Sequence, residues 1–382
     1  MRILIACGGT AGHMFPGLAL AGELKREEES REITIVISTH PREREYLKVA
    51  TPLLKGLHIE TVSATALPYN ISFKTIVFTA RLLRAFLKSF FIILKCRPQV
   101  VVGFGGYSSF APLIMARVIG IPTLIHEQNV TPGRANRLLA GIVDRIAVSF
   151  DSSNGFFSRV NPSKGVLKTG LPLRRHITES KAAAAKFTPP FPKPASAFTI
   201  LVLGGSQGAY SINELMLNCL DLMDRTVSQR LQLIHLSGNR DLCRVKSRYE
   251  TLGISHQVFG FIKDMAGVYK VTDLMVSRCG AGAIFEAAAF GLPCIFLPYP
   301  CAAQHQRENA LFLQRRGAAL VLDEKASSPQ DLKKILLELI ADEEMRQNLS
   351  RRIKMLECPQ ASRNLKEEVI ALYRHSNYTR GG

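Results

Sequence analysis

The stretch of sequence that decides the fold occurs twice: residues 3–12 read ILIACGGTAG, and residues 199–208 read TILVLGGSQG. Each copy is a short apolar run followed by two glycines, a hydroxyl residue, any residue and a third glycine, and each leads into a helical pattern. A strand, a tight glycine turn and a helix in this order open a doubly wound parallel-sheet domain. Because the copies lie about half a chain apart, the sequence predicts two similar domains.

Other apolar runs alternate with helical patterns along the chain, at residues 33–38, 99–103, 122–126 and 145–149. Continuous apolar strands with helices between them are typical of parallel sheets that are covered on both faces. We therefore predict an α/β protein with two Rossmann-like sheets. The proline-rich residues 188–194 are expected to form a surface loop or linker, residues 361–375 a helix, and residues 376–382 a frayed end.

Composition narrows the class of protein. With 382 residues, of which 47% are hydrophobic and 21% charged, the chain is long enough for two folded domains. The net charge of +18 favours a polyanionic partner, namely nucleic acid, an anionic membrane or a phosphorylated substrate. No uncharged apolar stretch approaches the roughly 20 residues that span a bilayer, and the first apolar run is shorter than that of a signal peptide. The eight scattered cysteines form no C-x-x-C pair, which favours buried thiols in a reducing compartment.

The glycine turns do not match the common nucleotide motifs. Gly280 and Gly282 begin a G-x-G-x-x-G motif, but Phe285 stands at its last glycine, and the ribose-binding acid expected about 20 residues further on is missing. A P-loop is also missing from the sequence. Nucleic-acid binding would require basic residues interleaved with exposed aromatic residues, or a known module, and neither is evident. These observations disfavour an oxidoreductase, a P-loop kinase and a nucleic-acid-binding protein.

Two residues near the turns are candidates for chemistry. The first turn is followed by His13 where the second copy has Ala209. The positive end of a helix dipole disfavours imidazolium, and a neutral imidazole suits a general base; the alternative is a histidine that only stabilises the turn. A third turn, residues 278–282, follows a strand at 273–277, and its small residues suit a diphosphate at a helix N-terminus. Glu286, one turn into that helix, can accept hydrogen bonds from a ribose diol, or can simply stabilise the helix dipole.

Eight motifs then carry a resemblance to a known family. In chain order they are GGTAGHMFPGLAL (8–20), GFGGYSS (103–109), HEQN (126–129), GLPLR (170–174), GGSQGA (204–209), FIKDM (261–265), SRCGAGAIFEAAAFGLP (277–293) and QHQRENA (304–310). With these motifs the chain closely resembles the MurG family, the inverting UDP-N-acetylglucosamine transferases of peptidoglycan synthesis, which have the GT-B fold and belong to glycosyltransferase family 28. The resemblance implies a cleft between two domains. Residues 1–168 would bind acceptor and membrane, residues 169–354 would bind the UDP-sugar, and a C-terminal helix at about 355–376 would pack back on the first domain.

The resemblance also implies roles for individual residues. His13 would be the catalytic base beside the acceptor, with Glu127 as the next candidate, and Tyr107 and Glu127 belong to the cleft loops. The residues implied to bind substrate are Thr10, Ala11, Gly12 and Asn129 at the donor sugar and diphosphate; Arg174 and Ser206 at the donor diphosphate; the Ile262 backbone at the uracil; Ala281, Gly282, Ala283, Ile284 and Phe285 at the diphosphate and uridine; Glu286 at the ribose; and Gln306 at the sugar hydroxyls. The chain departs from the family at Ala11, which replaces a glycine of the turn, and at Leu171-Pro172 and Gln304.

The implied reaction is transfer of N-acetylglucosamine from UDP-GlcNAc to undecaprenyl-diphosphate-linked N-acetylmuramyl-pentapeptide, converting lipid I to lipid II. The expected partners are UDP-GlcNAc, the lipid-linked acceptor, an anionic membrane surface and other cell-wall synthesis proteins, without nucleic acid. No cofactor is expected, and no metal, since the sequence holds neither Asp-x-Asp nor H-E-x-x-H. The expected location is the cytoplasmic face of the plasma membrane, as a peripheral protein. The alternative is another GT-B enzyme, such as a UDP-GlcNAc 2-epimerase or a glycolipid glycosyltransferase.

A basic and apolar segment suggests how the chain would reach a membrane. Residues 61–126 contain no Asp or Glu. At 100° per residue, Lys74, Arg81, Arg84, Lys88 and Lys95 fall on one helical stripe about 80° wide, with aromatic and aliphatic residues around it. We predict a helix that lies on anionic lipid through Arg81, Arg84 and Lys88. The alternative is a core helix with a solvated basic face.

Overall fold

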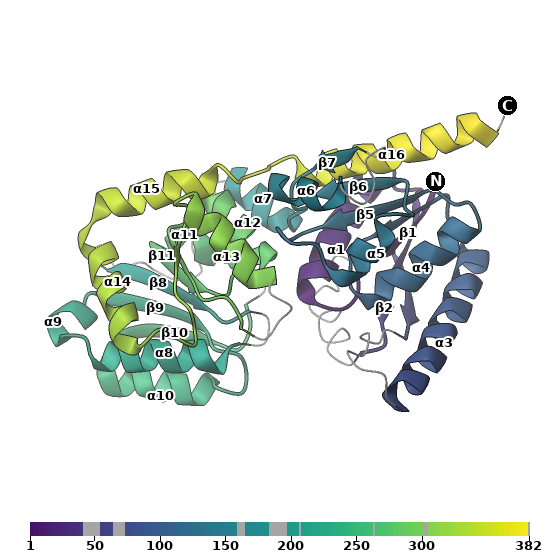
Figure 1. Ribbon diagram of the computed structural model, residues 1–382. Coiled ribbons are helices and arrows are strands. Elements are labelled where there is room, and N and C mark those ends of the chain that lie inside the picture. Colours follow the sequence, from purple (N-terminus) through teal and green to yellow (C-terminus); the bar gives the residue numbers. More distant parts are fainter. Residues whose placement is uncertain are drawn as a thin grey trace. The chain divides into compact units, whose positions relative to one another are not determined.

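The computed structural model describes residues 1–40, 54–63, 73–158, 165–182, 197–205, 208–262, 264–300 and 305–380. They form two compact units, Met1–Arg175 with Cys358–Gly382, and His176–Glu357. Each unit is a parallel sheet with helices on both faces (Figure 1). Along the chain, the boundaries between the units fall at residues 175/176 and 357/358. The sequence analysis placed these boundaries at 168/169 and 354/355. The proline-rich residues 188–194 lie outside the described residues.

The first unit contains a seven-stranded sheet in the order β3-β2-β1-β4-β5-β6-β7. The strands are β1 (Arg2–Ala6), β2 (Glu32–Ser38), β3 (His58–Val62), β4 (Val100–Gly103), β5 (Thr123–Glu127), β6 (Arg145–Val148) and β7 (Val166–Lys168). All adjacent strands are parallel; in the centre, Ile5 pairs with Ile35 on one side and with Val102 on the other. The apolar runs predicted as strands are confirmed, because they are the residues buried between two helical layers.

Helices cover both faces of this sheet (Figure 1). One core layer joins it to α1 (Ala11–Glu27) and α16 (Ala361–Arg380), and the other joins it to α3 (Phe73–Cys96), α4 (Tyr107–Val118) and α5 (Arg134–Leu139). The helix α16 follows the second unit in the chain yet packs on the first, because Leu365, Val369 and Leu372 present one apolar stripe to α1 and the sheet. It continues to Arg380, beyond the point where fraying was expected.

The second unit repeats the design with six parallel strands in the order β10-β9-β8-β11-β12-β13. They are β8 (Phe198–Leu203), β9 (Leu231–Leu236), β10 (Ser255–Phe259), β11 (Leu274–Ser277), β12 (Cys294–Phe296) and β13 (Leu320–Val321). One face packs against α8 (Tyr210–Asp221), α10 (Leu242–Leu252) and α14 (Pro329–Ala341), followed by α15 (Glu343–Lys354). The other face carries α11 (Met265–Val271), α12 (Ala281–Phe290) and α13 (His305–Arg315) (Figure 1).

A buried polar chain links the second sheet to two of its helices. Nδ1 of His235 lies 2.6 Å from the Tyr249 hydroxyl, and Nε2 lies 2.9 Å from Oδ1 of Asn213. Burial lowers the pKa of His235 to about 3 and raises the pKa of Tyr249, so the imidazole is neutral and the phenol keeps its proton. Tyr249 therefore donates to Nδ1, and the Nε2–H group donates to Asn213. These bonds satisfy buried polar groups of β9, α8 and α10.

Four of the seven cysteines in the described residues follow the sequence prediction of a buried thiol, and Cys301 lies outside those residues. Cys7, Cys219, Cys279 and Cys294 are buried, Cys96 and Cys358 are half-buried, but Cys243 is exposed on α10. Burial raises the pKa of the Cys279 thiol well above its ordinary value. No helix in the described part of the chain is both long enough and apolar enough to cross a membrane.

Candidate active site

The glycine turns lie where the strand order of each sheet reverses. In the first unit, GGTAGH follows β1 and GFGGYSS follows β4, and these strands are neighbours at the reversal. In the second unit, GGSQGA follows β8 and SRCGAG follows β11, again neighbouring strands. Ligands of doubly wound folds bind outside the carboxyl ends of the strands at this position. The topology therefore brings the motifs together in pairs, one pair in each unit.

The side chain of His13 is enclosed by backbone from the two turns of the first unit. Thr10 Oγ1 lies 3.2 Å from Nδ1 of His13. A Cβ atom added to Gly105 would lie 3.5 Å from Nε2, and one added to Gly106 would lie 3.3 Å from Nδ1 and only 2.5 Å from the Gly8 carbonyl oxygen. Gly105 and Gly106 also have φ of +85° and +73°. Glycine is therefore required at both positions, and its small size gives the imidazole its place.

Two helices begin at these turns with open N-termini. The caps of α1 and α4, Thr10 and Gly106, make no side-chain capping bond, and neither helix has an acidic residue in its first turn. Their first N–H groups and positive dipole ends suit an anion. At Gly12 an added Cβ would meet only Thr10 Oγ1, at an ordinary 3.6 Å. Internal packing does not explain the glycine, whereas close approach of a ligand does.

Glu127 organises the loop after β5. The carboxylate is 1% exposed. Its Oε1 accepts from the backbone and side-chain nitrogens of Asn129 at 2.9 and 3.2 Å, and Oε2 accepts from Gly133 N at 2.9 Å and Asn136 Nδ2 at 2.8 Å. Asn136 Nδ2 in turn lies 3.3 Å from the Cβ position of Gly105. Four donors thus converge on Glu127, so this carboxylate fixes Asn129 and positions Asn136 beside the turn that encloses His13.

The GLPLR segment lies against the same part of the first unit. His126 is fully buried, and its Nε2 lies 2.9 Å from the Gly170 carbonyl oxygen. Burial lowers the pKa of His126 to about 4, so the neutral ring donates from Nε2 to Gly170. The guanidinium of Arg174 stacks over the ring of Phe15 in α1, 4.8 Å from its centre. Arg174, predicted at the donor diphosphate, is therefore held against Phe15, which follows His13 by two residues in α1.

In the second unit, α12 begins at the third turn. Cβ atoms added to Gly280 or Gly282 would meet nothing within 4 Å, and neither residue has a positive φ. Neither packing nor backbone conformation explains these glycines, so the surface over the helix N-terminus is open for a ligand. Ala281, Ile284 and Phe285 point into the core, at 7%, 0% and 3% exposure. Of the predicted run, Gly282, Ala283 and Glu286 are half-buried, and the buried side chains hold the helix in place.

The structure describes three of the remaining predicted donor residues. Glu286 Oε2 accepts from the hydroxyl of Tyr269 at 2.6 Å. Ile262 is half-buried in the loop between β10 and α11. Gln306 lies in the first turn of α13, and its Oε1 accepts from the Tyr299 backbone nitrogen at 3.0 Å. Ser206 lies outside the described residues.

Sequence reasoning missed Arg278, which ties three segments to the third turn. Its guanidinium is 7% exposed and forms a two-pronged ion pair with Glu324. It also donates to Ser211 Oγ at 2.8 Å and to the Leu297 carbonyl oxygen at 3.2 Å, and stacks 5.2 Å from the centre of the Tyr299 ring. Burial alone would raise the pKa of Glu324, but hydrogen bonds from Arg278 and Ser211 outweigh it and lower that pKa. The signal available in the sequence was that an arginine directly follows the apolar strand predicted at residues 273–277.

Helix α3 exposes part of the predicted basic stripe and also a stripe of apolar side chains. Lys88 Nζ donates to Thr61 Oγ1 at 3.2 Å, and Lys95 Nζ pairs with Glu60 at 2.7 Å, so both turn towards β3. Arg81 and Arg84 are exposed, and the Lys74 side chain lies outside the described residues. Four large apolar side chains are exposed on the helix, at 60%, 54%, 64% and 51%: Leu83, Leu87, Phe91 and Leu94. Their spacing places them on one stripe, which the sequence analysis did not single out.

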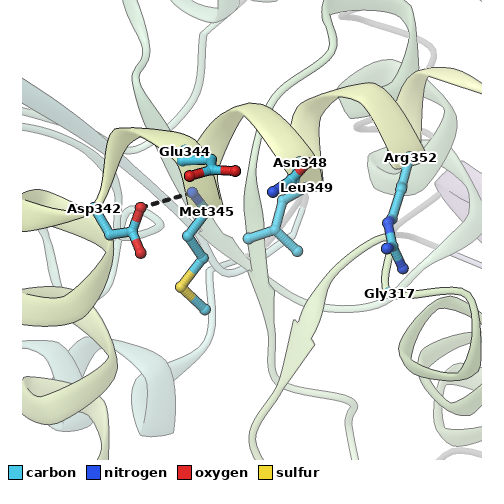
Figure 2. A pocket seen from close by; sticks show the side chains of 7 residues that line it. All are labelled: Gly317, Asp342, Glu344, Met345, Asn348, Leu349 and Arg352. Carbon is cyan, nitrogen blue, oxygen red and sulfur yellow. Dashed lines mark hydrogen bonds between the residues drawn. The ribbon is translucent and has the colours of Figure 1, made fainter.

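A shallow pocket lies elsewhere in the second unit, between α15 and the turn after α13 (Figure 2). Its lining residues are Gly317, Asp342, Glu344, Met345, Asn348, Leu349 and Arg352. Asp342 caps α15 by accepting from Met345 N at 2.8 Å. The pocket is lined by none of the predicted site residues.

Two family models match the chain. The glycosyltransferase family 28 N-terminal domain matches residues 3–148, and the glycosyltransferase family 28 C-terminal domain matches residues 199–365. A relative from Geobacter metallireducens is 40% identical over 343 residues, covering 90% of each chain. Another, from Lawsonia intracellularis, is 37% identical over 343 residues and 89% of each chain. Both are named UDP-N-acetylglucosamine–N-acetylmuramyl-(pentapeptide) pyrophosphoryl-undecaprenol N-acetylglucosamine transferase.

Solved structures agree on the fold. Acinetobacter baumannii MurG matches with a TM-score of 0.73 at 23% identity, covering 97% of this chain and 99% of its own. A UDP-GlcNAc 2-epimerase from Neisseria meningitidis, bound to UDP-GlcNAc, matches with a TM-score of 0.69 at 14% identity, covering 97% and 100%. A transferase and an epimerase thus share the architecture, so the fold by itself does not choose between their reactions. The two family models, together with relatives aligned over nine-tenths of the chain, do distinguish them: this chain belongs to glycosyltransferase family 28 and has the two-domain GT-B fold.

Proposed function

We propose that this chain transfers N-acetylglucosamine from UDP-GlcNAc to the undecaprenyl-diphosphate-linked N-acetylmuramyl-pentapeptide, with inversion at the anomeric carbon. One structural observation carries the proposal: the imidazole of His13 is held by Thr10 and enclosed by glycine turns at the strand reversal of the first unit. Relatives that align over most of the chain bear the name of this reaction.

The chemistry needs a base for the acceptor hydroxyl. As the acceptor oxygen bonds to the anomeric carbon, the bond from that carbon to UDP breaks and its electron pair leaves with the diphosphate. The hydroxyl proton passes to His13. Nδ1 is the nitrogen beside Thr10; with Nδ1–H donating to Thr10 Oγ1, Nε2 keeps the lone pair that takes the proton. A single displacement of this kind inverts the configuration.

Helix N-termini supply the charge stabilisation. The open first turns of α1 and α4 suit the acceptor diphosphate, and that of α12 suits the diphosphate of the donor. The space over Gly12 and Gly282 allows a close approach to these turns. Preorganised N–H groups that face developing negative charge lower the barrier without reorganising during the reaction.

The second unit binds the nucleotide. Glu286 accepts from the ribose hydroxyls, and the backbone of Ile262 meets the uracil. The Oε1 atom of Gln306 is engaged by the Tyr299 backbone nitrogen, so its NH₂ group is the part that we assign to the sugar hydroxyls. Arg174 and Ser206 complete the diphosphate contacts.

The lipid-linked acceptor requires the chain to work at a membrane surface, on its cytoplasmic face. The exposed stripe Leu83–Leu87–Phe91–Leu94 of α3 is suited to the boundary between headgroups and acyl chains. Arg81 and Arg84 are exposed on the same helix and would attract anionic lipid. We therefore assign peripheral membrane binding to α3, with the apolar stripe as its main contact.

The test is an assay with purified protein, labelled UDP-GlcNAc and the lipid-linked muramyl-pentapeptide. We expect the label to move into the lipid fraction and UDP to be released only when acceptor is present, with an inverted linkage in the product. Turnover of UDP-GlcNAc without acceptor would instead indicate an epimerase and would contradict the proposal.

A further inference from the structure

The structure joins Glu286 to a buried tyrosine that the sequence analysis did not consider. The hydroxyl of Tyr269 in α11 donates to Oε2 of Glu286 in α12 at 2.6 Å. Tyr269 is 1% exposed, whereas Glu286 is half-buried. We propose that Tyr269 is a positioning residue: it fixes the Glu286 carboxylate and thereby sets the preference of the site for a ribonucleotide over a 2′-deoxyribonucleotide. This inference rests on the proposed role of Glu286 at the ribose.

The geometry supports a fixed carboxylate. A donor–acceptor distance of 2.6 Å is at the short end for O–H···O bonds and is typical of an ionised acceptor. The Tyr269 ring is held by the core and by the ring of Phe290, 5.3 Å away between centres, so its hydroxyl has one position. A glutamate side chain otherwise samples several rotamers. The tyrosine therefore selects one orientation for Glu286.

A fixed carboxylate can still serve a ligand. A carboxylate has about four acceptor sites, so it can accept from Tyr269 and from a diol at the same time. The helix of Tyr269 also follows the loop of Ile262, and Asp264 caps this helix by accepting from Ala266 N at 3.1 Å. The segment assigned to the uracil thus continues directly into the residue that orients the ribose acceptor.

The site would discriminate between ribose and 2′-deoxyribose because the Glu286 carboxylate is held rigidly. A ribose offers two hydroxyl donors and a 2′-deoxyribose only one. A carboxylate held in the position for both loses a full hydrogen bond with the deoxy ligand, whereas a mobile one re-orients to the remaining hydroxyl and loses less. Removing the Tyr269 hydroxyl should therefore reduce the preference for ribose.

The experiment compares the Kd of UDP with that of 2′-deoxy-UDP by calorimetry on the full chain. Because a hydrogen bond to a charged group is involved, we expect a ratio of roughly tenfold in the parent. Tyr269→Phe keeps the ring against Phe290 and should lower the ratio at least about threefold. Glu286→Ala should bring the ratio close to one, and adding Tyr269→Phe to that variant should change nothing further.

Tyr249→Phe is the matched control, because it removes another fully buried hydroxyl from the same unit, one that bonds to His235 at 2.6 Å. It should keep the parental ratio, and thermal denaturation should show that all variants are folded. A parental ratio in Tyr269→Phe, with a collapsed ratio in Glu286→Ala, would overturn the positioning role alone. A parental ratio in Glu286→Ala would overturn the ribose contact itself. If Tyr269→Phe and Tyr249→Phe lowered the Kd ratio equally, general destabilisation of the unit would explain the effect, and the proposal would also be overturned.

Discussion

The hydroxyl oxygen of Thr10 lies 3.2 Å from Nδ1 of His13, across the first turn of α1. The Thr10 hydroxyl can accept from Nδ1–H, in the tautomer whose basic nitrogen is Nε2, or donate to Nδ1, in the opposite tautomer. The same contact also suits a histidine that only stabilises the turn, which was the alternative from the sequence. Kinetics separate the two.

His13→Ala should lower kcat by roughly 10²–10⁴, because the positioned base is lost. The affinity for UDP, measured by calorimetry, should barely change, since the uridine contacts belong to the second unit. The acid limb of kcat/KM should vanish in the variant. Thr10→Val should impair kcat more than Thr10→Ser, which keeps the hydroxyl. Near-parental turnover in His13→Ala would leave His13 as a turn residue.

Gly282→Ala should separate stability from binding. Alanine is favoured over glycine in a helix by about 0.5–1 kcal/mol, and an added Cβ would meet nothing within 4 Å, so the melting temperature should hold or rise. Affinity for UDP should fall on the order of tenfold, since forcing a methyl group into a close contact costs about 1–3 kcal/mol. Gly22→Ala is the control, because Gly22 is also helical with open space around it. If both variants bind UDP like the parent, the diphosphate does not approach Gly282.

Glu127→Gln tests the rival base. The amide would place an N–H group where the carboxylate now accepts from four donors, and each buried donor left unsatisfied costs about 1–3 kcal/mol. We expect lower thermal stability and lower kcat, with unchanged UDP affinity and a retained acid limb. Loss of that limb in Glu127→Gln, with its retention in His13→Ala, would make Glu127 the base.

Membrane binding should depend more on the apolar stripe of α3 than on its charge. Leu87→Glu with Phe91→Glu should abolish binding to neutral and anionic vesicles in a flotation assay. Arg81→Glu with Arg84→Glu should remove only the part of the vesicle binding that anionic lipid and low salt strengthen. Each basic residue near the surface contributes about 1 kcal/mol to that binding. Arg225→Glu with Arg230→Glu changes the net charge equally on exposed residues of the second unit and serves as the control. Parental binding by the Leu87/Phe91 variant would make the stripe an ordinary surface.

Stability should fall in acid partly through His235. Its pKa is lowered to about 3 in the fold, while an unfolded imidazole titrates near ~6.5. Between these values the unfolded chain binds a proton that the folded chain does not, so the free energy of unfolding decreases as pH falls, by up to about 1.4 kcal/mol per pH unit. His126, with a pKa of about 4, acts in the same direction in the first unit. Urea denaturation at a series of pH values from 7.5 to 4.5 gives the free energy of unfolding at each pH. This free energy should depend less steeply on pH in His235→Gln than in the parent, and an identical pH dependence would contradict the assignment.

Much of the architecture is local in origin and was therefore predictable. A short apolar run before two glycines and a helical pattern is enough to predict a strand, turn and helix, because backbone sterics and burial act over about a dozen residues. The repeat of this unit predicted two domains, and His13 stood out because one copy has a histidine where the other has Ala209. The resemblance of the motifs then assigned residues to a donor site, and this assignment stays a prediction.

Only the tertiary structure decided which distant side chains contact one another and which faces of a helix are exposed. Tyr269 meets Glu286 across two helices, and Arg278 meets Glu324 after a separation of 46 residues, so neither contact has a signature in spacing. The sequence showed a basic stripe on α3, but which face of a helix is exposed depends on what the other faces pack against. Lys88 and Lys95 turn to β3, and the apolar side chains of Leu83, Leu87, Phe91 and Leu94 are exposed on the same helix together with Arg81 and Arg84.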